Sequence, residues 1–91
     1  DKRFIRVEVK TTAGCEARRP AVYRWGTCRG SKIKTRVNTD FCDVIALVAL
    51  DVRRVIFRAT PTIAGINTRL PANLFDENCE KTTWDEATFI K

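Results

Sequence analysis

The 91-residue sequence contains no histidine. Histidine is the commonest general acid or base at neutral pH, and it activates the nucleophile in Ser–His and Cys–His systems. Most hydrolase mechanisms therefore do not apply. The adjacent carboxylates Asp76–Glu77 and Asp85–Glu86 fall in a segment that we expect to be exposed, where they would serve solvation and not proton transfer. We predict that the protein is not an enzyme and has no catalytic residue.

Glycine-rich loops and long apolar runs are also missing. The four glycines are isolated from one another, so no loop can cradle a phosphate. The longest apolar run is residues 44–50, whereas a membrane-spanning helix needs about 20 residues. The sequence therefore predicts neither a transmembrane segment nor a cofactor.

The four cysteines, Cys15, Cys28, Cys42 and Cys79, are too far apart for a zinc site, which usually has close cysteine pairs, and no C-x-x-C redox motif is present. No metal site is expected. Two disulfides would offset the low stability that the small core of a short domain provides. Disulfides are also typical of secreted proteins. Three pairings are open, of which we favour Cys15 with Cys28 and Cys42 with Cys79. The predicted location is extracellular, with entry into a host cell as a further option.

Alternating polar and apolar residues predict several strands. In residues 3–11, Ile5, Val7 and Val9 alternate with charged residues, which indicates a half-buried strand with the apolar side inward. Residues 21–38 are expected to form a hairpin around a turn at residues 29–31. A second hairpin is expected from residues 55–59 and 63–69, with its turn at residues 60–62.

Residues 40–52 fit either a helix or a buried strand. Asp40 as N-cap, Asp43 in the first turn, and Arg53 and Arg54 at the end favour the helix. Beyond Pro71 we expect an acidic tail that Cys79 anchors. The predicted fold class is therefore α+β, a single domain over residues 1–91 with a small antiparallel β-sheet and one helix, stapled by two disulfides.

Positive charge is concentrated in the first part of the chain. Residues 1–38 hold 11 Lys or Arg and 3 Asp or Glu, whereas residues 39–91 hold 6 and 8. Alternate residues in the second arm of the first hairpin form a cationic row with a spacing of about 7 Å, close to that of phosphates along a nucleic-acid strand. A solvated sheet face that discourages aggregation is the alternative, and the two aromatic residues of the first arm suit either stacking or the core. The candidate binding residues are Arg24, Lys32, Lys34, Arg36, Tyr23 and Trp25.

Residues 54–79 resemble the end of the guanyl-specific fungal ribonucleases. The similarity covers residues 54–57, 63–68 and 73–75 and a late cysteine, Cys79. It implies that the arginine, histidine and phenylalanine of that family fall on Arg54, Asn67 and Phe75. Asn67 cannot act as a general acid, and no equivalent of the family's catalytic glutamate is identifiable. The resemblance therefore implies a ribonuclease-like scaffold without activity, similar to small secreted effectors of plant-pathogenic fungi.

These features predict a secreted effector or toxin-like protein with a role in virulence. It would bind a host protein or another anionic macromolecule, such as RNA, through its basic surface and without catalysis. An RNA-binding ribonuclease-like pseudoenzyme is the first alternative. A membrane-active antimicrobial protein or killer toxin is the second.

Overall fold

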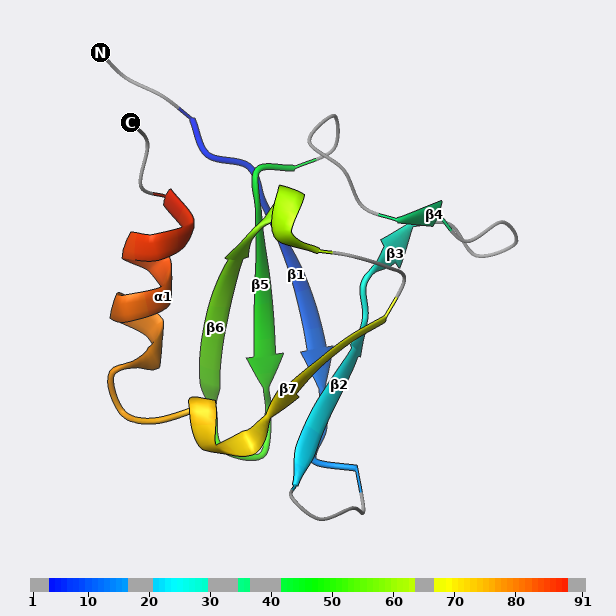
Figure 1. Ribbon diagram of the computed structural model, residues 1–91, viewed down its shortest axis with the longest axis vertical. Helices are drawn as coiled ribbons and strands as arrows, with labels where there is room; N and C mark the ends of the chain where they lie inside the picture. Colours follow the sequence, from blue (N-terminus) through cyan, green and yellow to red (C-terminus); the bar gives the residue numbers. More distant parts are fainter. Residues whose placement is uncertain (1–3, 17–20, 30–34, 37–41, 64–66, 89–91) are drawn as a thin grey trace.

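The computed structural model describes residues 4–16, 21–29, 35–36, 42–63 and 67–88 (Figure 1). Within these ranges the strands form three small sheets, ordered β1-β5-β6, β2-β7 and β3-β4, with one α-helix. This confirms the α+β class. The elements are β1 (Val7–Thr12), β2 (Val22–Gly26), β3 (Cys28–Arg29), β4 (Thr35–Arg36), β5 (Val44–Ala49), β6 (Arg54–Ala59), the 3-10 turn η1 (Thr60–Thr62), β7 (Asn67–Pro71), the 3-10 turn η2 (Ala72–Leu74) and α1 (Cys79–Thr88).

The apolar run of residues 44–49 forms β5, so the prediction of a helix there is wrong. β5 is the central strand, parallel to β1 and antiparallel to β6. Five of its six residues are buried, because both of its faces are covered. A strand buried on both faces is a continuous apolar run, and the periodicity of such a run cannot distinguish it from a helix. Arg53, expected at a helix end, instead lies in the turn to β6 with a φ of 55°.

Asp43, expected in the first turn of that helix, instead holds β1 beside β5. Its Oδ2 accepts hydrogen bonds from the Arg6 backbone N (2.9 Å) and Nε (3.3 Å), and its Oδ1 accepts one from Arg6 Nη2 (3.0 Å). A forked contact of this kind matches the planar geometry of the guanidinium group. It therefore fixes the register at the start of the parallel pair.

Strand β1 alternates as predicted, but with the opposite side inward. Val7 and Val9 are 39% and 59% exposed, whereas Glu8 and Lys10 are half-buried and form an ion pair of 3.7 Å. The cause is the pairing with β5, which places Glu8 beside Ile45, on the face that carries the core. The prediction of an inward apolar side on this strand is therefore wrong.

The core lies between this face of the three-stranded sheet and the two-stranded β2–β7 ribbon, which crosses beside it in Figure 1. Tyr23, Trp25 and Phe75 pack together with ring centroids 5.0 to 5.8 Å apart. Trp25 Nε1 donates to the Val48 carbonyl oxygen (3.0 Å), and Tyr23 OH donates to Asp51 Oδ1 (2.8 Å). The aromatic residues can be buried because their polar atoms have partners.

The first predicted hairpin is confirmed only at residues 28–29 and 35–36, which pair antiparallel, and the second predicted hairpin is wrong. β2 pairs with β7 and β6 pairs with β5, while β3 and β4 form a separate pair of two residues each. The strand segments themselves were largely recognised from strand-forming residues beside turn signals. Pairing depends on long-range packing, so strands that are close in sequence need not be neighbours.

The expected acidic tail contains the helix α1, which lies along the outer edge of β6 (Figure 1). Thr83 Oγ1 accepts a hydrogen bond from the Phe57 backbone N (2.9 Å), and Cys79 Sγ donates to the Val55 carbonyl oxygen (3.3 Å). Trp84 packs edge-on against Phe57, with centroids 4.9 Å apart. Cys79 and Thr83 are four positions apart and therefore share one face of the helix. This face supplies hydrogen-bond partners to the edge of β6 and covers that edge.

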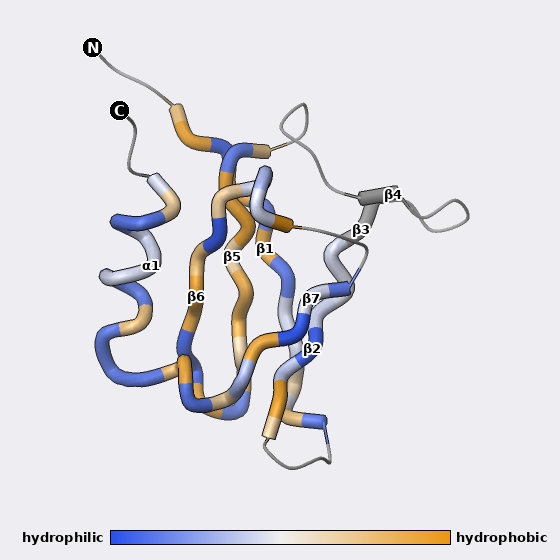
Figure 2. Tube along the Cα trace, in the orientation of Figure 1, coloured by the Kyte–Doolittle hydropathy of each residue, from blue (hydrophilic) through white to orange (hydrophobic). Residues whose placement is uncertain are grey.

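Hydropathy along the chain agrees with this arrangement. In Figure 2 the apolar residues concentrate in β5 and β6, whereas α1 is largely polar. Among the residues that the structure describes, no helix has the length and apolar character to cross a membrane.

The predicted stapling by two disulfides is not confirmed, since Cys15, Cys42 and Cys79 all carry free thiols. Cys42 Sγ lies 3.4 Å from Thr60 Oγ1, at the end of β6, while Cys79 contacts Val55, near its start. Five residues of strand span roughly 16 Å. A disulfide requires Cα atoms within about 7 Å, so the favoured Cys42–Cys79 pair does not fit this fold. The side chain of Cys28 lies outside the described part.

Candidate anion-binding site

The outer face of the β2–β7 ribbon carries two arginines that lie directly opposite each other. Arg24 of β2 and Arg69 of β7 are cross-strand partners, and their side chains are 47% and 49% exposed. Opposed side chains in an antiparallel pair have Cβ atoms about 5 Å apart, so two like charges there repel. We call these two residues the arginine pair.

Glu16 partly neutralises the arginine pair. Its Oε2 lies 3.6 Å from Arg24 Nε, and its Oε1 lies 3.3 Å from Arg69 Nε. A short bridge between Glu16 and Val22 brings the carboxylate to the ribbon. One carboxylate balances one of the two guanidinium charges, which leaves the cluster with net positive charge.

Asn67 orients one member of the pair. Arg24 Nη1 donates to Asn67 Oδ1 over 3.2 Å, which holds the guanidinium along the strand. Arg24, Arg69 and Asn67 all lie on exposed positions of the two strands. The result is a positioned group of donors facing outward from the sheet.

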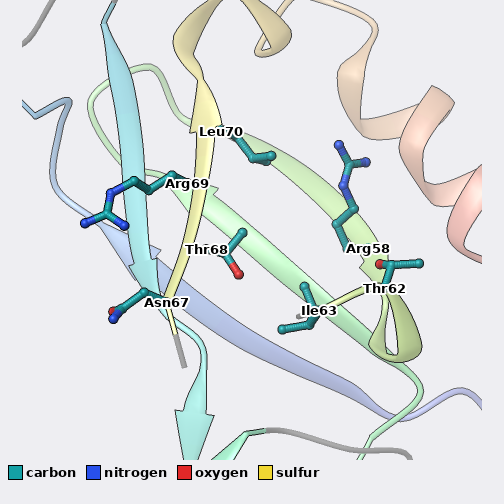
Figure 3. Close-up of a pocket in the computed structure, with 7 residues that line it drawn as sticks. All are labelled: Arg58, Thr62, Ile63, Asn67, Thr68, Arg69 and Leu70. Atoms are coloured by element: carbon teal, nitrogen blue, oxygen red, sulfur yellow. The ribbon is translucent and has the colours of Figure 1, made fainter. Parts of the chain in front are cut away.

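Next to this face lies a pocket of about 440 Å³ between β7 on one side and β6 with η1 on the other (Figure 3). Figure 3 shows Thr68, Leu70 and Ile63 between the two walls, while Arg58 rises from β6. We call it the Arg58 pocket. It is lined by Arg58, Thr62, Ile63, Asn67, Thr68, Arg69 and Leu70.

The structure places the predicted binding residues in different environments. Arg24 is exposed and belongs to the arginine pair, as described above. Tyr23 and Trp25 are 2% and 1% exposed, so they are core residues, and their predicted role as stacking surfaces is wrong. Arg36 lies opposite Cys28 in the β3–β4 pair, and its side chain is outside the described part. Lys32 and Lys34 also lie outside the described residues.

The positions carried over from the ribonuclease resemblance are only partly brought together. Arg54 Nη1 donates to the Phe75 carbonyl oxygen over 2.7 Å. Asn67 is bonded to Arg24 at the start of β7, whereas Phe75 follows the end of that strand. The Arg54–Phe75 contact thus joins β6 to the segment before α1.

Sequence reasoning missed Glu16, Arg58 and Arg69 as site residues. Arg69 reaches Arg24 through β2–β7 pairing and Glu16 reaches it through the bridge to Val22, and the sequence has no local signal for either. The alternation of residues 67–71 could have placed Arg69 on an exposed face, but not opposite Arg24. Within the described ranges, no three His, Cys, Asp or Glu side chains group closely enough to hold a metal ion.

Comparison with known proteins adds no relative: no family model, no curated protein and no solved structure matches this chain.

Proposed function

We propose that the protein is a non-catalytic binding protein that holds a phosphate-rich macromolecule, with RNA as the candidate, on the outer face of the β2–β7 ribbon. The observation that supports this most directly is the arginine pair. Two half-exposed guanidinium groups face each other across the strands and share one carboxylate, Glu16. Such opposed like charges cost folding free energy, and an anionic partner would offset that cost.

Arginine chemistry suits a phosphate partner. The guanidinium presents five N–H donors in a planar fork, which binds phosphate oxygens in pairs. In the arginine pair the Nε atoms face Glu16, and one Nη of Arg24 faces Asn67. The remaining terminal donors of Arg24 and Arg69 stay available for an incoming phosphate.

The overall charge favours association with a polyanion. The formal net charge is +6, and residues 1–38 carry most of the positive charge. Such a field attracts polyanions and raises the rate of association. Secretion, virulence and the ribonuclease-like scaffold stay predictions from the sequence, as does the membrane-active alternative, which vesicle leakage would test.

The experiment is salt-dependent RNA binding by the wild type and by the double variant Arg24→Gln/Arg69→Gln. A matched control, Arg53→Gln/Lys81→Gln, removes two positive charges elsewhere on the surface. We expect the first variant alone to bind more weakly, with the slope of log K against log salt reduced by about 1.4, which corresponds to two phosphates of a single strand. No retention of RNA by the wild type at low salt, or equal losses in both variants, would reject the proposal.

A further inference from the structure

Arg58 is a half-buried cation that forms no ion pair with any residue that the structure describes. It lies opposite Ile45 in the pairing of β5 with β6, on the face of the sheet that carries the core. Its one hydrogen bond within the described ranges is a long one of 3.5 Å, from Nη1 to the Phe57 carbonyl oxygen. No carboxylate of the described residues lies within 4.0 Å of its guanidinium group. Most of its five N–H donors are therefore unused, although partial burial makes an uncompensated charge costly.

The other groups in the Arg58 pocket do not supply an anion. Thr62 Oγ1 donates to the Ala59 carbonyl oxygen (2.7 Å), and Thr68 Oγ1 shares a hydrogen bond of 3.0 Å with Thr27 Oγ1. Ile63 and Leu70 contribute apolar surface. None of the described residues that line this pocket is acidic. The unused hydrogen-bonding groups of this pocket are therefore the N–H donors of Arg58, which lie next to the apolar surface of Ile63 and Leu70.

Asn67 and Arg69 belong to the rim. Figure 3 shows both side chains on the far side of β7, directed away from Arg58, whereas Leu70 is directed toward the space between the walls. The alternation of β7 explains this, because successive side chains point to opposite faces. The Arg58 pocket and the arginine pair are thus separate sites on two faces of one strand.

From these observations we propose that the Arg58 pocket binds a small organic oxyanion with an apolar body. The carboxylate or phosphate oxygens accept paired hydrogen bonds from Arg58, and the apolar body packs on Ile63 and Leu70. Arginine binds both kinds of oxyanion through the same planar fork. A volume of about 440 Å³ lies within the ordinary range for small-ligand sites. This site goes beyond the proposed macromolecule binding and does not depend on it.

Glu86 is the internal competitor for Arg58. Two adjoining cavities, of about 230 and 180 Å³, are each lined by both Arg58 and Glu86. A carboxylate on that side attracts the guanidinium away from the pocket. Removal of its charge should therefore favour binding of the oxyanion.

The experiment titrates ¹⁵N-labelled protein with benzoate, phenyl phosphate and neutral phenol, and follows the amide resonances of η1 and β7. We expect at least one oxyanion to bind and phenol not to bind. Arg58→Gln should weaken binding about tenfold or more, since it removes a charge-assisted pair of hydrogen bonds. Glu86→Gln should strengthen it. Binding of benzoate alone would identify a carboxylate ligand, and binding of phenyl phosphate alone a phosphate ester.

Control variants separate this site from the macromolecule site. Arg24→Gln should weaken polyanion binding and leave the affinity for the small oxyanion unchanged. The proposal is overturned if no probe shifts the η1 and β7 amides, if phenol binds as well as the oxyanions, or if Arg58→Gln binds like the wild type. If Arg58→Gln fails to fold, the comparison of Glu86→Gln with the wild type decides, and equal affinity there counts against the proposal.

Discussion

Replacement of Glu16 by Gln should lower stability and raise polyanion affinity at the same time. The carboxylate holds two guanidinium groups, of Arg24 and Arg69, at 3.6 and 3.3 Å. All three side chains are partly exposed, at 31% for Glu16 and 47% and 49% for the arginines. Glutamine keeps the size of the side chain and removes the charge. The variant therefore exposes the repulsion between the opposed arginines.

The magnitude follows from exposed electrostatics. Each exposed ion pair contributes about 0.2 to 1 kcal/mol, and directly opposed like charges on a sheet cost a similar amount. Glutamine can still accept hydrogen bonds, which offsets part of the loss. We therefore expect the free energy of unfolding to fall by about 1 kcal/mol. Salt should reduce this difference, because exposed charges are screened.

The assay is urea unfolding together with RNA binding at two salt concentrations. The matched control is Glu77→Gln, which makes the same charge change at an exposed position before α1. Both variants gain one unit of positive charge, so only a local effect separates them. For Glu16→Gln we expect lower stability, tighter binding and a salt slope steeper by about 0.7 if one more phosphate is neutralised. Weaker binding by Glu16→Gln, or binding equal to the control, would refute the reasoning.

Three further predictions concern the helix edge and the thiols. Thr83→Val leaves a partly buried β6 amide without an acceptor, so we expect the free energy of unfolding to fall by about 1 to 3 kcal/mol. Thr82→Val, at an exposed position, should change it little, and urea midpoints compare the two. Burial is the main cause that raises the pKa of Cys79 above 9.0 and that of Tyr23 above 10.0. The unfolded chain therefore loses these protons first, so stability should be level up to about pH 8 and fall above it; urea unfolding across pH tests this, and a rise would contradict it. Exposed Cys15 should react with iodoacetamide in the native protein, whereas buried Cys79 should react only on unfolding; peptide mass spectrometry locates the adducts, and equal labelling of both would contradict the fold.

Local patterns located strands better than they located their partners. Alternation identified the segment of β1, and strand-forming residues beside turn signals identified β2, β6 and much of β7. The same pattern says nothing about whether β2 pairs with residues 32–37 or with β7. For β1 it even suggested the wrong inward side, since the ion pair of Glu8 and Lys10 lies on the core face. Pairing and facing depend on the packing of distant segments.

The helix α1 escaped prediction for a different reason. Its buried residues are only Cys79 and Thr83, so it has no apolar stripe of the usual kind. The contacts that hold it are hydrogen bonds to the edge of β6 and the packing of Trp84 on Phe57. A helix that is held by polar side chains hydrogen-bonded to the edge of a sheet shows no hydrophobic periodicity in its sequence.

For the candidate site, the charge distribution indicated the correct kind of group but only one of its members, Arg24. Arg69 becomes its neighbour through a pairing across 45 residues of sequence, and Glu16 joins them through the bridge to Val22. Arg58 was not singled out because it was the single charged residue in the predicted strand of residues 55–59. Its significance comes from partial burial with no ion-pair partner in the part of the chain that the structure describes, which the sequence alone does not show.

Strand β7 links the two proposed sites. Its odd-numbered positions face outward and include Arg69, while Thr68 and Leu70 face the Arg58 pocket. The period of two residues thus places the two proposed sites on opposite faces of one strand. Because the strand is shared, a ligand that shifts β7 would also shift Arg69 relative to Arg24. The affinity for RNA, measured with and without the oxyanion, therefore reports the coupling between the faces, and Arg58→Gln should abolish any such coupling while leaving the arginine pair intact.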